Sequence, residues 1–381
     1  MKKILAIFPS SILYGKERSN YEVFKIINNS EHLSLSIIAN RNASLNLIEM
    51  LNEFDTYYIS FPTRKGRFRY VKYLYRYILA NIYMAFYMLS NRVDCIYLND
   101  EMSIFDFFPC LLCTKAKIIY RIGDAPAFPT LTGYKLNSYM WNTIVNKKVS
   151  TIVCISNFIK SEIYKLGRIS NNDCVIYNFP PTRKIQRDEE YTFRRGSSLI
   201  LGYLGRIDNI KGVHILIDAV IRMLDKKMDV VLYLGGDVSV CPDYYSDLYR
   251  KVLRSGYNDK IQFLGELNNV SCFFNSIDIL CVPTIVQEAL GNVIVEAKSN
   301  KTPVVVFPSG GMPEIIESGV DGYVCSDKSV ESLEDIIALY YYNRKLVELH
   351  SENSYMSLSK LGISYDVFKD KWNDIFIKTL Q

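Results

Sequence analysis

The sequence predicts an α/β protein built from two Rossmann-like domains, each with a doubly wound parallel sheet. The first observation is a repeated alternation of short apolar runs with longer amphipathic stretches in both halves of the chain. The second is the length of 381 residues, which suits two domains of ordinary size. Because ligands bind at the carboxyl ends of parallel strands, we expect a ligand cleft between the two domains.

Short apolar runs predict the strands, and longer amphipathic stretches predict the helices. In the first half, the strand runs are Ile4–Phe8, Ser34–Ile38, Thr56–Ile59, Cys95–Leu98, Lys117–Ile122, Thr151–Ile155 and Asp173–Ile176. In the second half, they are Leu199–Leu204, Val230–Leu234, Ile261–Leu264, Ile279–Val282, Pro303–Phe307 and Tyr323–Cys325. Helices are expected at Val213–Leu224, Leu290–Ser299 and Val330–Tyr342, among other stretches.

A polar segment that begins with adjacent prolines, Pro180 and Pro181, predicts the domain boundary. The predicted domains are a first domain over residues 1–179 and a second over 198–360, joined by a linker over 180–197. A closing segment, 361–381, completes the chain.

Charge differs between the two halves. Residues 1–180 carry 22 Lys and Arg against 13 Asp and Glu, a net charge of +9, whereas residues 181–381 carry 23 against 27, a net charge of −4. This asymmetry predicts different partners for the two domains, with an anionic partner for the first. The composition, 49% hydrophobic and 22% charged, excludes a disordered chain or a coiled coil.

The chain has neither the pattern of a secretion signal nor that of a membrane span. The apolar run near Met1 covers about five residues, against roughly 7–15 in a signal peptide. The longest charge-free apolar stretch, Tyr77–Ser90, is shorter than the roughly 20 residues that cross a bilayer. We therefore expect a cytoplasmic protein in which the nine cysteines are reduced.

The sequence supports neither a metal site nor a catalytic triad of nucleophile, histidine and acid. Cys110 and Cys113 form a C-x-x-C pair, but no second pair or nearby histidine completes a zinc site, so we predict core thiols and no metal. The three histidines, His32, His214 and His350, do not stand beside a Ser or Cys nucleophile with a supporting acid.

The turn after the Leu199–Leu204 strand combines glycines with two cations. Gly205 and Gly212 let the backbone approach a ligand closely, and the following helix start offers unpaired N–H groups. Arg206 and Lys211 suit a diphosphate, Arg through its planar fork and Lys as a point charge. The alternative is an ordinary strand-to-helix turn with two solvated cations.

Two glutamates, Glu288 and Glu296, stand eight positions apart, one before a predicted helix and one about two turns inside it. Amides of the first turn, at Gly291, Asn292 and Val293, suit a phosphate or sugar oxygen. A carboxylate in an apolar helix calls for a partner, although an exposed surface glutamate is the alternative. A third glycine turn, Pro308–Glu314, favours an anion-binding cleft over a chance gathering of loops.

As a set, these motifs resemble the retaining glycosyltransferases of family 4, nucleotide-sugar enzymes with two Rossmann-like domains in the GT-B arrangement. The similarity is strongest over Leu199–Val324, where the three motifs occur in the family's order. Fainter similarities lie at Gly15–Arg18, Ile155–Phe158 and Val175–Asn178. The last segment, Tyr365–Leu380, resembles the family's closing helix, which crosses back onto the first domain.

The resemblance implies roles for the matching residues. Arg206 and Lys211 would neutralise the donor diphosphate and so replace a metal ion electrostatically. Glu288 would face the transferred sugar, and Glu296 would bind the ribose of a UDP- or GDP-linked donor, with no further cofactor. The implied donor-binding residues are Gly15, Gly205, Gly291, Asn292, Val293 and Glu296, and the implied catalytic residues are Glu288, Arg206, Lys211 and Asp124.

The sequence also departs from the family pattern. Gly123 stands where the family often has a histidine, and it is followed by Asp124, which we expect to contact the acceptor or the donor sugar. Leu290 replaces a common aromatic, and Asn300 replaces a common glycine. Asn tolerates a left-handed backbone, so the second change is mild.

Residues 64–77 interleave cations with Tyr and Phe, a composition typical of a segment at an anionic membrane surface. A solvated loop that leads into a buried helix is the alternative. No nucleic-acid motif accompanies the segment, so we expect no nucleic-acid partner. The resemblance favours peripheral attachment to the inner face of the cell membrane, because many relatives use lipid-linked acceptors.

The sequence thus predicts a retaining, metal-independent glycosyltransferase that acts on a glycan or lipid-linked acceptor. By family analogy, we expect it to act in the synthesis of a bacterial surface polysaccharide: capsule, O-antigen or lipopolysaccharide. Two alternatives stay open: a nucleotide-sugar epimerase with the same architecture, and a non-catalytic subunit that binds nucleotide sugars.

Overall fold

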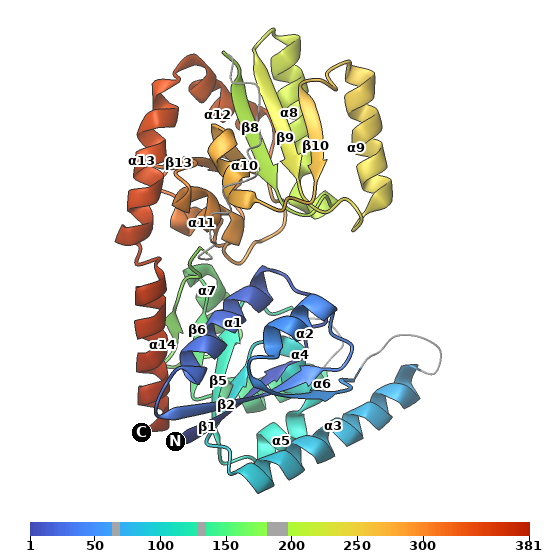
Figure 1. Cartoon of the computed structure of the whole chain (residues 1–381), viewed down its shortest axis with the longest axis vertical. Coiled ribbons are helices and arrows are strands. Elements are labelled where there is room, and N and C mark those ends of the chain that lie inside the picture. Colours follow the sequence, from blue (N-terminus) through green and yellow to red (C-terminus); the bar gives the residue numbers. More distant parts are fainter. Residues whose placement is uncertain (63–68, 128–134, 181–196) are drawn as a thin grey trace. The chain divides into compact units, whose positions relative to one another are not determined.

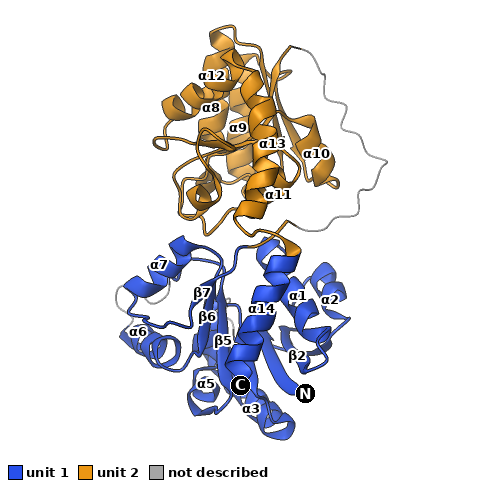
Figure 2. Cartoon of the chain, turned by 90° about the vertical axis from the view of Figure 1, so that its left-hand side faces the viewer, with its two compact units in different colours: residues 1–177, 366–381 blue, residues 178–365 orange. Residues whose placement is uncertain are grey.

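The computed structural model describes residues 1–62, 69–127, 135–180 and 197–381 (Figure 1). The chain forms two compact units, unit 1 with residues Met1–Tyr177 and Asp366–Gln381, and unit 2 with residues Asn178–Tyr365 (Figure 2). Each unit has its own parallel sheet, which confirms the predicted fold class. Of the predicted linker 180–197, all but Pro180 and Ser197 lies outside the described residues.

Unit 1 contains a seven-stranded sheet in the order β3-β2-β1-β4-β5-β6-β7. The strands are β1 (Lys2–Phe8), β2 (Leu33–Asn40), β3 (Asp55–Ile59), β4 (Cys95–Leu98), β5 (Lys117–Ile122), β6 (Thr151–Cys154) and β7 (Cys174–Val175). β1 begins two residues before the predicted run, because the ladder continues through the exposed Lys2, which pairs with Leu33 of β2. Charged, exposed residues at the end of a strand lie outside the apolar run from which the strand is predicted.

The helices of unit 1 are α1 (Gly15–Asn28), α2 (Leu45–Leu51), α3 (Arg69–Asn91), α4 (Glu101–Asp106), α5 (Phe108–Cys113), α6 (Lys135–Trp141) with a π-helical turn at Asn142–Asn146, α7 (Asn157–Lys165) and α14 (Tyr365–Leu380). α1 and α14 cover the same face of the sheet. Tyr97 of β4 contacts both Phe24 of α1 and Trp372 of α14, with ring centroids 5.8 Å apart in each case. The last helix of the chain is thereby part of the core of unit 1.

Unit 2 contains a six-stranded sheet in the order β10-β9-β8-β11-β12-β13. The strands are β8 (Leu199–Leu204), β9 (Val230–Gly235), β10 (Ile261–Gly265), β11 (Ile279–Val282), β12 (Val304–Val306) and β13 (Gly322–Val324). The helices are α8 (Val213–Asp225), α9 (Pro242–Ser255), α10 (Val270–Ser276), α11 (Asn292–Ser299), α12 (Val330–Tyr342) and α13 (Lys345–Lys360), with 3₁₀ turns at Asn209–Lys211 and Met312–Ile315.

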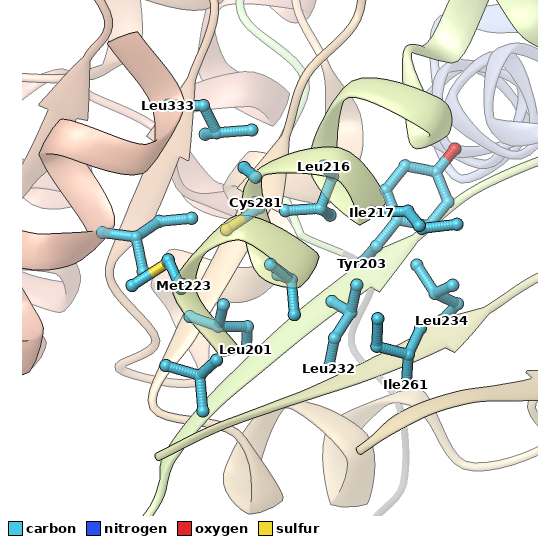
Figure 3. Packing of buried hydrophobic residues seen from close by; sticks show 14 of the residues in the cluster. Leu201, Tyr203, Leu216, Ile217, Met223, Leu232, Leu234, Ile261, Cys281 and Leu333 are labelled. Carbon is cyan, nitrogen blue, oxygen red and sulfur yellow. The ribbon is translucent and has the colours of Figure 1, made fainter. Parts of the chain in front are cut away.

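One face of this sheet forms the main core of unit 2. Alternate residues of β8, Leu201 and Tyr203, pack with Leu216 of α8 and Leu333 of α12 (Figure 3). On the other face, Gly202 leaves room for α10 and the residue that follows it, because a Cβ at Gly202 would lie 3.0 Å from Phe273 and 2.3 Å from Ile277. β8 is therefore a continuous apolar run, as is typical of a strand in a parallel sheet that is covered on both sides.

Both sheets reverse their winding direction in the middle. In unit 1 the reversal lies between β1 and β4, and in unit 2 it lies between β8 and β11. Connections on the two sides of such a point diverge, which opens a crevice at the carboxyl ends of the two strands. The fold therefore specifies one expected ligand-binding edge in each unit.

A buried ion pair holds α11, the helix that carries Glu296. Lys298 and Asp321 lie 2.8 Å apart, and their side chains are 0% and 1% exposed. Lys298 also donates to the backbone carbonyl of Ile315. Burial lowers the pKa of Lys298, and the nearby Asp321 carboxylate opposes that shift. The pair thus links α11 to the turn before β13.

No helix among the described residues is long and apolar enough to cross a membrane.

We predict that Lys298→Met lowers the free energy of unfolding of unit 2 by about 3–5 kcal/mol, because it leaves the Asp321 carboxylate buried without its partner. The matched control is Lys301→Met, which removes an exposed pair with Glu352 and should cost less than about 1 kcal/mol. Urea unfolding followed by circular dichroism measures both changes.

Tryptophan fluorescence provides an internal control for this experiment. Both tryptophans, Trp141 and Trp372, belong to unit 1, so their fluorescence follows unit 1 alone. Equal losses of stability in the two variants would contradict the structural role of the Lys298–Asp321 pair.

Candidate functional site

The loop after β8 is held by a capping aspartate. The buried Asp208 accepts a hydrogen bond from the backbone N–H of Lys211, and its carboxylate lies 3.3 Å from the Arg206 guanidinium. Tyr203 donates from its hydroxyl to the carbonyl of Arg206 at 2.7 Å. The backbone around Arg206 is therefore fixed from two sides, while the Arg206 side chain stays 41% exposed.

An ion pair spans the reversal point of the unit 2 sheet. Lys211, which follows β8, lies 2.5 Å from the carboxylate of Glu288, which follows β11. Their side chains are 20% and 27% exposed, so both are partly accessible. The structure thus brings together two of the predicted site residues that are 77 positions apart in the sequence.

Glycines allow the three loops of this edge to pack backbone against backbone. A Cβ at Gly212 would lie 2.0 Å from the carbonyl oxygen of Pro283, and one at Gly310 would lie 2.0 Å from that of Glu288. Gly311 donates its N–H to the same Glu288 carbonyl at 2.8 Å. The loop after β12 therefore holds the main chain of Glu288, and the ion pair with Lys211 holds its side chain.

The helix α11 begins at Asn292, two residues later than predicted, because Gly291 adopts a left-handed backbone with φ of 84°. Glu296 is consequently the fifth residue of the helix and lies about one turn inside it, which corrects the predicted two turns. The first N–H groups of the helix, at Asn292 and Val293, lack partners within the helix. Asn292 also accepts a side-chain hydrogen bond from Asn178 at 2.7 Å.

Glu296 lines a small hollow in unit 2, whose volume of ≈ 10 Å³ is about that of a single water site. The other lining residues are Pro180, Val270, Ser271, Phe274, Ser299 and Asn300. An aromatic ring and several hydroxyl or amide groups thus surround the carboxylate.

The neutral residues near the start of α8 add no charge to this edge. His214 contacts the hydroxyl of Tyr244 at 2.8 Å, and burial lowers the pKa of the imidazole, so it is uncharged at pH 7. Burial raises the pKa of Tyr244 to about 12. Among the described residues, the charged groups of this edge include Arg206 paired with Asp208, Lys211 paired with Glu288, and Lys328, which donates to the carbonyl of Ile285.

Among the described residues, no group of three or more His, Cys, Asp or Glu side chains is arranged to hold a metal ion.

The remaining predicted site residues lie in unit 1. Gly15 is the first residue of α1, and Asp124 follows β5. Asp124 forms an ion pair of 3.3 Å with Lys16, the neighbour of Gly15. The structure thus separates the predicted site residues into a larger group in unit 2 and a smaller group in unit 1.

Sequence reasoning missed three residues that shape these groups. Asp208 caps the turn before α8, and its position three residues before Lys211 is a recognisable capping signal. Gln287 accepts a hydrogen bond from the N–H of Gly310 at 2.5 Å, for which the sequence holds no signal. Lys16 pairs with two carboxylates that are distant in the sequence, so only the fold reveals its position.

The predicted membrane segment, residues 64–77, is only partly within the described residues. Residues 64–68 lie outside them, and residues 69–77 form the start of α3. Several of these side chains are exposed, among them Tyr70, Val71, Leu74 and Tyr75. α3 is thus exposed on one face and buried on the other, where Ala80, Met84 and Tyr87 lie, which is compatible with both interpretations of the segment.

Comparison with known proteins agrees with this architecture. Residues 198–342 match the family model described as glycosyl transferases group 1. Over 156 residues, the chain is 28% identical to the lipopolysaccharide core biosynthesis mannosyltransferase LpcC of Rhizobium leguminosarum bv. viciae, covering 41% of this chain and 44% of that protein. Over 235 residues, it is 22% identical to the capsular polysaccharide biosynthesis glycosyltransferase CapM of Staphylococcus aureus, covering 59% of this chain and 61% of that protein.

The chain spans about half the length of the curated relatives it matches, with covered shares of 44%, 48% and 35% for three of them. Solved structures match over nearly the whole chain. Anabaena Alr3699/HepE in complex with UDP has a TM-score of 0.80 at 17% sequence identity, with 99% of this chain and 100% of that chain covered. At this identity the match establishes the fold.

The fold is thus that of the GT-B class, with two doubly wound units and a cationic loop edge in unit 2. Residues 198–342, which lie within unit 2, match the family of glycosyl transferases group 1.

We predict that Gly310→Ala disrupts the clamp around Glu288 and lowers the stability of unit 2 by more than about 4 kcal/mol, because the new Cβ would overlap the Glu288 backbone. The control is Gly256→Ala. Gly256 also has a left-handed backbone, with φ of 76°, but a Cβ there meets nothing within 4 Å, so only backbone strain of about 1–3 kcal/mol is expected.

Thermal unfolding and amide hydrogen exchange measure these effects. Exchange should increase over residues 284–291 in Gly310→Ala and stay unchanged there in Gly256→Ala. Similar results for the two variants would show that close backbone packing is not what positions Glu288.

Proposed function

We propose that the protein is a retaining, metal-independent glycosyltransferase that moves a sugar from a nucleotide-sugar donor to a glycan or lipid-linked acceptor. The main support is the pair formed by Lys211 and Glu288 across the reversal point of the unit 2 sheet, with Arg206 beside it. Cations and a carboxylate at such an edge suit a ligand that is both a diphosphate and a sugar.

Lys211 and Arg206 would bind the donor diphosphate. The negative charge on the diphosphate increases as the bond to the sugar breaks, so two fixed cations stabilise the transition state more than the ground state. This electrostatic role is the one that a divalent metal fulfils in other phosphate chemistry. The exposed guanidinium of Arg206 is accessible to the ligand.

Glu288 would face the transferred sugar, where its carboxylate binds hydroxyls or stabilises positive charge at the anomeric carbon. When the diphosphate takes over Lys211, the Glu288 carboxylate loses that partner and is available to the sugar. Glu296 would bind the ribose of a UDP- or GDP-linked donor beside Phe274. The amides of Gly291–Val293 would donate to donor oxygens, and Gly205 would let the main chain approach the phosphates.

The biological setting we propose is the synthesis of a bacterial surface polysaccharide. LpcC and CapM, two relatives of this chain, are named for lipopolysaccharide core and capsular polysaccharide biosynthesis. The basic first half of the sequence would serve the acceptor side, with Asp124 near the acceptor or donor sugar.

We predict that Glu288→Ala lowers kcat/KM by about 100-fold or more, as is typical when a group that stabilises the transition state is removed. Nucleotide affinity should change by less than about threefold, because Arg206 and Lys211 remain. Glu331→Ala, which removes an exposed carboxylate paired with Arg222, is the matched control and should retain full activity. Full activity of Glu288→Ala would refute the site assignment.

Thermal-shift measurements with a panel of UDP-, GDP- and other nucleotide sugars identify the donor, since selective binding stabilises the fold. Product analysis then separates the proposal from its rivals. A transferase releases nucleoside diphosphate when an acceptor is present, an epimerase interconverts the donors, and a binding subunit does neither.

We further propose that the protein attaches to an anionic membrane surface through residues 64–77. α3 contains Lys72 and Arg76 and has no acidic residue from Arg69 to Asn91. Its exposed apolar side chains continue beyond the segment at intervals of three or four residues, as on one face of a helix. The residues at these intervals are Val71, Leu74, Ile78, Ile82, Phe86 and Leu89, and Tyr70, Tyr75 and Leu79 are exposed beside them.

We predict that the double variant Lys72→Gln, Arg76→Gln binds vesicles containing anionic lipid about tenfold or more weakly than the wild type, at about 1 kcal/mol for each cation near the surface. Ile82→Ser with Phe86→Ser should weaken binding by removing apolar contact. Ile169→Ser is the control, because Ile169 is 91% exposed in unit 1 outside α3. Equal recovery of all proteins in liposome flotation would exclude this attachment.

A further inference from the structure

Three charged side chains meet at the reversal point of the unit 1 sheet. Lys16 stands near the start of α1, after β1, while Asp100 follows β4 and Asp124 follows β5. The ammonium of Lys16 lies 3.3 Å from a carboxylate oxygen of each aspartate. The cluster therefore spans the carboxyl ends of three neighbouring strands, where a doubly wound sheet binds its ligands.

The cluster is held rigidly on one side and open on the other. Asp100 caps α4 by accepting from the N–H of Met102 at 2.8 Å, which orients its second oxygen toward Lys16. Asn20 donates to the carbonyl of Lys16 at 2.8 Å. The side chain of Asp124, in contrast, is 75% exposed. A ligand can therefore approach from the side of Asp124.

Lys16 is charged in this position. Burial alone would lower the pKa of its ammonium, but the carboxylates of Asp100 and Asp124 raise it above its usual value. An ammonium has three hydrogen atoms to donate, and the two aspartates accept two of them. One donor of Lys16 and several carboxylate lone pairs therefore stay available for a ligand.

Gly123 lies beside the stem of Lys16. A Cβ at Gly123 would lie 3.7 Å from Cγ and 3.8 Å from Cδ of Lys16, which is ordinary van der Waals contact. The lysine stem therefore lies directly against the backbone that follows β5 and precedes Asp124.

A second, independent observation at the same strand end is the amide of Asn99. Asn99 lies between β4 and Asp100 and is 2% exposed. Neither its amide nitrogen nor its amide oxygen has a hydrogen-bond partner among the described residues. A buried amide without partners is unusual in a folded protein, and a bound water or ligand is one way in which such a group is satisfied.

We infer that Lys16, Asp100 and Asp124 form a binding site for the hydroxyl groups of a neutral sugar ring on the acceptor, an inference that rests on the proposed glycosyltransferase function. Sugar hydroxyls both donate and accept, so they match the free carboxylate lone pairs and the remaining ammonium hydrogen. One cation and two carboxylates give the cluster a net charge of −1, which repels phosphate. The related pair in unit 2, Lys211 with Glu288, differs because Arg206 adds a second cation.

The test compares the full-length wild type with Lys16→Met, Lys16→Arg and, as the control, Lys25→Met, which removes a lysine that pairs with Glu22 on the same helix. The probes are the methyl glycosides of glucose, mannose, galactose and N-acetylglucosamine, each titrated with UDP present and followed by saturation-transfer NMR. UDP itself is titrated into each protein by calorimetry.

We expect the wild type to bind at least one glycoside, Lys16→Met to bind it at least about tenfold more weakly, and Lys16→Arg and Lys25→Met to stay within about threefold. UDP affinity should be the same in all four proteins. The inference is wrong if the wild type binds no glycoside, if Lys16→Met binds as the wild type does, or if Lys16→Met also loses UDP.

The two proposals fail in different ways. A wild type that binds no nucleotide of the UDP or GDP type contradicts the proposed donor chemistry, whereas the glycoside titrations without nucleotide still report on the Lys16 cluster. If the wild type binds nucleotide but none of the glycosides, the proposed donor site is unaffected, and only the inference about the Lys16 cluster is wrong.

Discussion

The reversal of winding direction in each parallel sheet is the constraint on which the sites depend. Between β1 and β4, and again between β8 and β11, the connections leave in opposite directions, so backbone does not close the edge. In both units, a lysine from the first connection bridges this opening to a carboxylate that follows the fourth strand in chain order: Lys16 to Asp100 and Lys211 to Glu288. The same topology thus produces a similar charged bridge twice.

The two ion pairs differ in the residues that surround them. This difference is the basis for proposing that unit 2 binds the donor diphosphate and unit 1 binds hydroxyls of the acceptor. The unit 2 bridge has a second cation in Arg206 and glycines that let three loops pack main chain against main chain, as at Gly310 and Glu288. The unit 1 bridge has a second carboxylate in Asp124. In this proposal the two cations of the unit 2 edge, Arg206 and Lys211, bind a diphosphate, and the unit 1 cluster of one lysine and two aspartates binds neutral hydroxyls. Net charge over the two halves of the sequence has the opposite sign.

Much of the fold was predictable, because hydrophobic periodicity reflects burial directly. The strands Cys95–Leu98 and Ile279–Val282 have the predicted ends, since the first is an apolar run between Asp94 and Asn99 and the second lies between Asp278 and Pro283. Prediction was less accurate where backbone geometry overrides polarity. β1 extends through charged Lys2, and α11 begins only after the left-handed Gly291, which places Glu296 one turn rather than two inside the helix.

By itself, the sequence determined the fold class, the order of the strands along the chain and the glycine-rich turns of unit 2, because these features depend on residues close together in the chain. Only the tertiary structure decided which distant charges meet. Lys16 and Asp124 are 108 positions apart, and Lys211 and Glu288 are 77 apart, so no local pattern predicts either ion pair. Strand order determines these contacts, because adjacent parallel strands bring their carboxyl ends to one edge whatever their separation in sequence.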